Sequence, residues 1–399
     1  LGVVVFQDQV LEVAIALAGF SVGEAEGLRR AMSRKRSEEA IEAFRARFVE
    51  GAVAKGVEPK LADEVYDKLV GFSGFGFPKS HAAAFGLLAY QSAWLRHHYP
   101  GEFLCALLNA QPMGFYPPAS LVRDAQRRGV EVRPPHVNRS EAKCSIEDGA
   151  VRIGLEYVSS LGADDAQVVA AAAPFENVVD LAQRTAIGQE GLESLIASGA
   201  CDGLGASRRA LLWELGLVPR SQSVPGSDGV ERQLALPLDP TAQTPELAEP
   251  TEWEEMLANY RRTSLSVDVH PMELIRRHLP DGVLSSHDLG QAPDRSRVAV
   301  AGMAVARQRP ATAKGVVFML LEDEFGQVNL IVPPQVYERH RAIVRGEPLI
   351  LARGVFERVE RNQNVVVREL ETLAPLARKL SGAPELVSAL PEAHHFGHR

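Results

Sequence analysis

The spacing of apolar residues changes along this chain from a helical period to a strand period. Residues 7–118 and 155–217 repeat apolar residues three and four positions apart, which is typical of amphipathic helices. Residues 296–375 instead form short segments separated by turn residues. In these segments, which contain many β-branched residues, apolar residues either alternate with polar ones or follow one another without a break. We therefore predict a mixed, multidomain protein that is mostly helical and carries a small antiparallel β-barrel near its end.

The segments between these regions predict the remaining boundaries. Asp148-Gly149 lies between two short apolar runs and predicts a tight hairpin. Residues 218–250 are rich in Pro, Ser and acidic residues, a composition typical of a linker without a core of its own. We expect a helical domain at 1–118, a small mixed region with helical hairpins at 119–217, the linker at 218–250, connecting helices at 251–295, the barrel at 296–375 and a tail at 376–399.

Charge and cysteine content narrow the classes of function. The net charge of -8 gives no overall cationic field, so binding to nucleic acid requires basic residues gathered locally. Cys105, Cys144 and Cys201 lie far apart and form no CxxC pair, which favours a reducing, cytoplasmic location. No apolar run reaches about 18 residues, so we expect no membrane partner. The first residues, LGVVVFQDQV, are apolar and lack an initiator Met, and we expect a piece of a longer protein.

A basic cluster follows the first predicted helices. It comprises Arg29, Arg30, Arg34, Lys35 and Arg36. On a helix, Arg30 and Arg34 lie one turn apart and share a face. The planar fork of an Arg side chain suits phosphate oxygens. A solvated helix face accounts for the same residues, so both interpretations stay open.

A second candidate anion site lies at the turn GFGFPKSH. Gly74 and Gly76 allow backbone conformations that other residues avoid, and Ser80 is placed to cap the apolar helix that follows. A helix start offers unpaired N–H groups, and Lys79 and His81 add positive charge. A phosphate fits this arrangement, as does an ordinary capped helix with a solvated lysine.

Two segments share the order helix, glycine turn, helix. The first is residues 155–172, with Gly162, and the second is residues 192–215, with Gly203 and Gly205. Such turns present backbone N–H groups to DNA phosphates without reading bases. Arg208 and Arg209 after the second turn favour DNA, although generic helical hairpins have the same pattern.

The linker contains an apolar hexapeptide, QLALPL, at residues 233–238. Apolar residues in a disordered segment gain nothing by staying exposed, so either a partner groove or a harmless apolar patch explains it. We predict no metal site: His394, His395 and His398 are expected in a solvated tail, and no carboxylate pair, catalytic triad or Walker loop is present.

The residues quoted so far resemble a known family. GVVVFQDQVLEVA, LAGFSVGEAEGLRRAM and GFGFPKSHAAAFGLLAYQSAWL are similar to the fingers of bacterial C-family DNA polymerases, the replicative alpha-subunit class. The order of fingers, tandem helix-hairpin-helix, linker and OB-fold matches over nearly the whole chain. QPMGFYPPASLVRDAQRRGVEVRPPHVNRS and the HHFGHR tail more closely resemble the error-prone branch, which performs damage-induced translesion synthesis.

This resemblance implies roles for the candidate residues. Arg29, Arg30, Arg34 and Lys35 match the fingers surface that meets the incoming dNTP and the template, and Lys79, Ser80 and His81 look like its second part. In the family, the helix-hairpin-helix pair grips the primer-template backbone, and the OB-fold lies near single-stranded template. OB-folds bind such strands with cations and aromatic rings, for which the candidates here are Phe318, Phe325, Arg353, Phe356 and Arg358.

The resemblance also implies partners and a missing catalytic centre. The family's catalytic aspartates bind Mg²⁺ in a palm that precedes the fingers, so no catalytic residue is expected in this chain. QLALPL resembles the hexapeptide that binds the sliding clamp, with Gln233, Leu234, Leu236 and Leu238 as contacts; companion translesion proteins carry much of the clamp contact in the error-prone branch.

Three other interpretations remain at this point. The chain is a non-catalytic scaffold that binds DNA and the sliding clamp, or a part of a replicative alpha subunit of the same family. An unrelated helical RNA-binding protein with an OB-fold is the third, but it leaves the fingers motifs unexplained.

Overall fold

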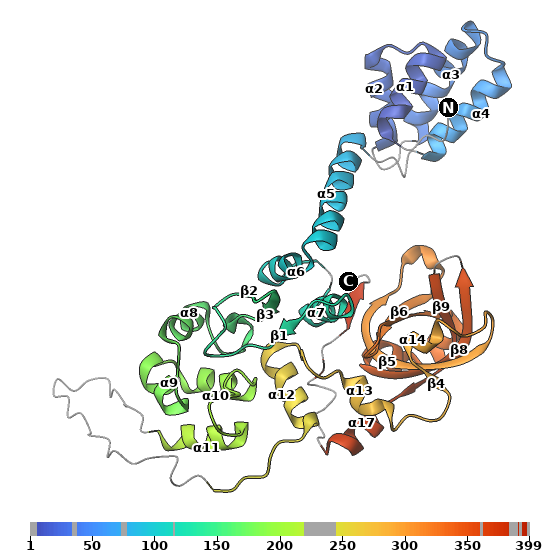
Figure 1. The fold of residues 1–399 in the computed structure, drawn as a ribbon. Helices are drawn as coiled ribbons and strands as arrows, with labels where there is room; N and C mark the ends of the chain where they lie inside the picture. Colours follow the sequence, from blue (N-terminus) through green and yellow to red (C-terminus); the bar gives the residue numbers. More distant parts are fainter. Residues whose placement is uncertain are drawn as a thin grey trace, which may run out of the picture. The chain divides into compact units, whose positions relative to one another are not determined.

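The computed structural model describes residues 6–33, 38–72, 78–114, 116–218, 245–359, 362–382, 390 and 393–396. The chain forms two units, residues 1–98 and 99–399, and each is described by itself (Figure 1). No helix among the described residues is long and apolar enough to cross a membrane.

The described residues of the first unit are almost all helical, as the period of their apolar residues predicts. Its core is built around Leu28, Phe48 and Tyr66, whose side chains are fully buried. Gly51 allows the closest approach, because a Cβ there would lie 1.9 Å from the carbonyl oxygen of Ala18. Its helices are α1 (Gln7–Ala18), α2 (Val22–Ser33), α3 (Glu38–Ala54), α4 (Pro59–Phe72) and α5 (Lys79–His98).

The second unit begins with a small mixed layer. Helix α6 (Pro100–Asn109) packs against this layer and α7 (Pro118–Arg127), so the helical unit ends before the predicted residue 118. The predicted hairpin is present, because Asp148 and Gly149 both take the left-handed conformation between paired strands. The strands are β1 (Val132–Arg133), β2 (Ser145–Glu147) and β3 (Ala150–Arg152), in the order β1-β3-β2.

A helical layer follows, with a core of its own around Leu155, Leu181, Leu195 and Leu211. The predicted first helix at residue 155 is only a 3₁₀ turn, η1 (Leu155–Tyr157), because the backbone is already extended at Val158, with a φ of -78° and a ψ of 121°. The helices are α8 (Ala163–Ala172), α9 (Val178–Thr185), α10 (Gln189–Ala197) and α11 (Arg208–Leu217).

The helices after the linker connect this layer to the barrel. Thr251 and Glu254 form a reciprocal capping box that starts α12 (Glu252–Thr263). The Arg262 guanidinium donates to Ser194 Oγ in α10 at 3.1 Å, which ties α12 to the helical layer. Two shorter helices follow, α13 (Pro271–Arg276) and α14 (Ser286–Leu289).

The barrel closes where β5 pairs with β8, and Figure 1 shows its strands curving around a common interior. Alternate residues, among them Val300, Met319, Leu330 and Phe356, fill that interior. Two short helices interrupt the strands of the barrel, α15 (Pro334–Arg339) and α16 (Arg341–Gly346). The remaining elements are β4 (Val283–Leu284), β5 (Arg297–Gln308), η3 (Ala311–Ala313), β6 (Val317–Glu322), β7 (Gln327–Val332), β8 (Leu349–Val359) and β9 (Asn362–Thr372).

The predicted tail contributes to the fold. Helix α17 (Ala374–Ser381) packs against α13, and Leu390 and Ala393 are buried. Strand β10 (His394–Phe396) pairs in parallel with Ala306–Gln308 of β5. The backbone of His394 and His395 is therefore part of the barrel sheet rather than of a free tail, because the edge of β5 offers hydrogen bonds that an extended segment completes. His398 lies outside the described residues.

Candidate nucleic-acid interface

The turn between α10 and α11 carries two exposed glycines. Gly203 and Gly205 are exposed and have φ values of 96° and 92°, which residues with a side chain rarely adopt. Leu204 between them is buried and anchors the turn. Ser207 caps α11 by accepting from the N–H of Ala210. The earlier N–H groups of α11 have no partner inside the helix, so the turn suits an anion.

The two arginines after this turn are engaged within the protein. The guanidinium of Arg208 binds Asp202 Oδ2 at 2.8 Å and Asn259 Oδ1 at 2.9 Å, and its side chain is only 12% exposed. Arg209 binds Glu254 Oε1 at 2.7 Å. Both side chains therefore brace the turn and α11 against α12. Neither guanidinium group is therefore a phosphate ligand in this structure.

The first glycine turn differs in conformation and charge. Gly162 is the N-cap of α8 with a φ of -68°, which any residue adopts. Asp164 and Asp165 occupy the first turn of α8. Carboxylates there stabilise the helix dipole but repel a phosphate. The two turns that look alike in sequence are therefore unequal as anion sites.

In the first unit, the described part of the basic cluster shares one carboxylate. Arg29 NH2 and Arg30 Nε lie 2.6 Å and 3.1 Å from Glu26 Oε1. The hydrogen bond from Arg29, followed by that from Arg30, lowers the pKa of Glu26 to about 2. Glu26 thus offsets part of the positive charge. Arg34, Lys35 and Arg36 lie outside the described residues.

The first residues of α5 carry the predicted Lys79, Ser80 and His81, and all three are exposed. Ser80 is the second residue of the helix, so the prediction that it caps α5 is wrong. Asp8 Oδ2 instead accepts from the N–H of Lys79 at 3.2 Å. Asp8 also helps to raise the pKa of Arg29, after the larger effect of Glu26. The carboxylate of Asp8 therefore accepts from the start of α5 and also acts on Arg29 through its charge. Gly74 and Gly76 lie outside the described residues.

The aromatic candidates of the barrel divide into two groups. Phe318 and Phe325 are 40% and 56% exposed, so their rings are open to a base. Phe356 is fully buried, and we drop it from the set because β8 turns its side chain into the barrel. Ile331 on β7 lies directly opposite Phe318 and was not among the residues predicted for this surface. The alternation of polar and apolar residues in QVNLIV was the sequence signal that could have identified it.

The basic candidates of the barrel are also partly engaged. Arg353 on β8 forms an ion pair with Glu371 of β9. The guanidinium of Arg358 lies 5.4 Å from the centre of the Phe356 ring and donates to the carbonyl oxygen of Gly290 at 2.6 Å. Both arginines therefore bind other parts of the barrel region, and these contacts do not orient either side chain toward a ligand.

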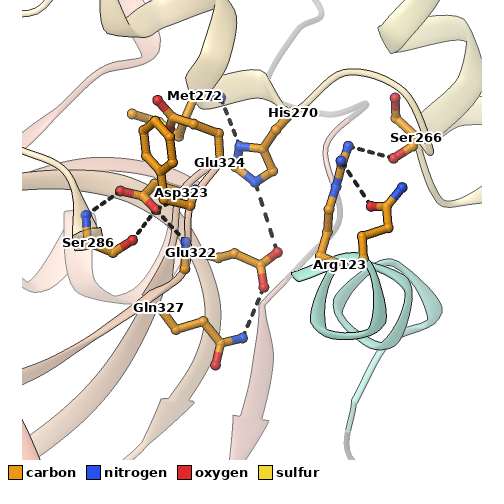
Figure 2. Close-up of polar contacts among 12 residues, drawn as sticks. Arg123, Ser266, His270, Met272, Ser286, Glu322, Asp323, Glu324 and Gln327 are labelled. Carbon is orange, nitrogen blue, oxygen red and sulfur yellow. Dashed lines mark hydrogen bonds and ion pairs between the residues drawn. The ribbon is translucent and has the colours of Figure 1, made fainter. Parts of the chain in front are cut away.

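Sequence reasoning missed a buried polar cluster that joins the barrel to α13 (Figure 2). His270 and Glu322 are both 1% exposed, with Nε2 and Oε1 at 3.9 Å, too long for a hydrogen bond. Burial holds the pKa of His270 well below its ordinary value and raises the pKa of Glu322. Arg127 lies 3.5 Å from Glu322 and Arg276 lies 3.0 Å from Asp323. These bonds connect α7, α13 and the turn after β6.

Comparison with known proteins identifies relatives over almost the whole chain. An error-prone DNA polymerase of Anaeromyxobacter dehalogenans is 42% identical over 393 residues, covering 94% of this chain and 34% of that protein. That of Corynebacterium efficiens is 40% identical and covers 96% of this chain and 35% of the relative. That of Burkholderia pseudomallei is 40% identical, and the match covers 94% of this chain and 36% of that protein.

This chain is a homologue of part of the bacterial error-prone DNA polymerases. It spans about a third of the length of these curated relatives.

Two family models match separate parts of the chain. The model of the bacterial DNA polymerase III alpha subunit finger domain matches residues 1–56, which include Arg29 and Arg30. The helix-hairpin-helix motif matches residues 129–211, which contain both glycine turns. The hexapeptide contacts lie outside the described residues, namely Gln233, Leu234, Leu236 and Leu238.

Proposed function

We propose that this chain is the part of an error-prone, DNA-directed DNA polymerase that holds the primer-template and the incoming nucleotide. The supporting observation is an identity of about 40% to error-prone DNA polymerases over 94% of the chain. In the whole protein the reaction is nucleotidyl transfer during damage-induced translesion synthesis.

The second glycine turn supplies the contact to duplex DNA in this proposal. Exposed N–H groups at Gly203 and Gly205 and the start of α11 bind phosphate oxygens, which positions the duplex without reading its sequence. Each neutralised phosphate releases counterions, so the affinity for duplex DNA falls with rising salt.

Arg29 and Arg30, with Arg34 and Lys35, bind the triphosphate of the dNTP in this proposal. Arg30 is 73% exposed and shares Glu26 with Arg29. A triphosphate carries more negative charge than one carboxylate, so it competes for both guanidinium groups. Lys79 and His81 add to the same surface of the first unit. On the barrel, Phe318 and Phe325 stack on single-stranded template.

The metal requirement is assigned to another part of the whole protein. Polymerases of this kind use divalent metal ions, and we propose Mg²⁺. Among the described residues, no three His, Cys, Asp or Glu side chains are gathered closely enough to hold a metal ion. These residues do not fit Mg²⁺, so no catalytic step is derived from them.

The sliding clamp is a further proposed partner, through residues 233–238, together with companion translesion proteins in the cytoplasm. Binding of the clamp by a peptide spanning residues 231–240 tests this contact. No binding at millimolar peptide removes it.

Primer extension tests the proposed function. The whole protein is expected to extend a primer past a damaged template base when Mg²⁺ and dNTPs are present, whereas the 399-residue chain alone is expected to extend nothing. Extension by the chain alone would contradict the assignment of catalysis to another part. Failure of the whole protein to extend even an undamaged template would contradict the polymerase function.

A further inference from the structure

His136 lies beside the second glycine turn, on a loop that the protein holds rigidly. The N–H of Val137 donates to the carbonyl oxygen of Ala200 in the turn at 2.8 Å. The N–H of His136 donates to Ser140 Oγ at 2.9 Å, and Ser140 Oγ donates to the carbonyl oxygen of Ile153. The loop is thus tied both to the turn and to the strand layer, and the position of the imidazole follows from these bonds.

The hydrogen bonds of the ring fix which nitrogen carries the proton. His136 Nδ1 accepts from the N–H of Asn138 at 3.0 Å. In a neutral imidazole the other nitrogen, Nε2, then carries the proton and is a donor. No acceptor among the described residues takes a hydrogen bond from Nε2. It lies 3.6 Å from the place where a Cβ on Gly203 would stand, so this donor borders the exposed glycine turn.

We propose that His136 is a ligand of the duplex DNA backbone, whose Nε2–H donates to the phosphate held by the second glycine turn. This inference rests on the proposed function, because the ligand is the same DNA phosphate. It assigns the side-chain contact that Arg208 and Arg209 do not supply, since their guanidinium groups bind Asp202 and Glu254.

The charges around the imidazole give the contact a pH dependence. Burial, followed by Arg152 and Arg139, lowers the pKa of His136, while Asp202 and Glu147 act in the opposite direction. The ring is therefore neutral at neutral pH and still donates from Nε2. A bound phosphate favours the charged form and raises this pKa, so DNA binding takes up a proton as the pH falls.

Matched variants separate the distal donor from the structural role of the ring. In His136→Asn the side-chain oxygen replaces Nδ1 as acceptor for the N–H of Asn138, but nothing replaces Nε2–H. The thermal midpoint of the 399-residue chain should stay close to that of the wild type. His278→Asn, at an exposed position in the turn after α13, is the control.

The measurement is the affinity for an undamaged DNA duplex over a series of salt concentrations. Loss of one hydrogen bond to a phosphate should weaken binding about three- to tenfold in His136→Asn. The slope of log K against log salt should steepen by up to about 0.9 for the wild type as the pH is lowered and His136 takes up a proton. This steepening should be absent from His136→Asn and retained in His278→Asn.

The outcomes distinguish a failure of the His136 contact from a failure of DNA binding at the glycine turn. If His136→Asn binds like the wild type at every pH while the wild type shows salt-dependent binding, His136 is not a DNA ligand and the proposed function stands. If the wild-type chain shows no salt-dependent affinity for duplex DNA, the assignment of the turn to DNA fails, and the role of His136 fails with it.

Discussion

The two glycine turns of the helical layer have similar sequences and different capacities for an anion. In the second turn, Gly203 and Gly205 take left-handed conformations and stand exposed before α11. In the first, Gly162 has an ordinary φ, and Asp164 and Asp165 stand at the start of α8. Backbone conformation and local charge therefore decide which turn suits a phosphate, whereas the order of helix, turn and helix, which both turns share, does not.

The largest expected effect comes from the brace of the second turn. Arg208→Ala removes a bidentate contact to Asp202 and a bond to Asn259, and should lower the free energy of unfolding by roughly 1.5–3 kcal/mol. Chemical denaturation of the 399-residue chain measures this. Arg209→Ala is the comparison, because its more exposed ion pair with Glu254 should contribute less than about 1 kcal/mol. Equal losses in the two variants would show that Arg208 is not a brace.

The next effect concerns the conformation of the turn. Gly205→Ala places a side chain at a φ of 92°, which costs about 1–2 kcal/mol and displaces the neighbouring N–H groups. Affinity for duplex DNA should fall about tenfold, as two phosphate bonds weaken. Gly162→Ala has an ordinary φ and no atom within 4 Å of the added Cβ, so it should bind like the wild type. A larger loss in Gly162→Ala would reverse the ranking of the turns.

The smallest effect is a gain at the first turn. Replacing Asp164 and Asp165 with Asn removes two negative charges from the start of α8. Duplex affinity at low salt should rise about two- to fivefold, because each charge at a helix start is worth a few tenths of a kcal/mol or more. Fluorescence anisotropy with a labelled duplex measures the change. A decrease in affinity would mean that these carboxylates support the bound state.

The general architecture was predictable because its signals are local. The change from helical to strand period located the helical region and the barrel, and the residue pair Asp148-Gly149 located the hairpin, where both residues take positive φ values. Gly203 and Gly205 were recognisable because positive φ values favour glycine.

The engagement of the candidate side chains was not predictable, because their partners are distant in sequence. Arg208 binds Asn259, and His270 approaches Glu322, only after the chain has folded. Phe356 was assigned to the surface because alternation alone does not say which face of a strand points inward. Strand β10 was missed because a short polar segment at a sheet edge carries no periodic signal.

Hydrogen exchange of single amides tests the central claim most directly. A saturating DNA duplex should slow exchange at residues 203–207 of the 399-residue chain and leave residues 162–165 unchanged. This result would place the duplex backbone on the second glycine turn. Protection at residues 162–165 without protection at residues 203–207 would contradict the account.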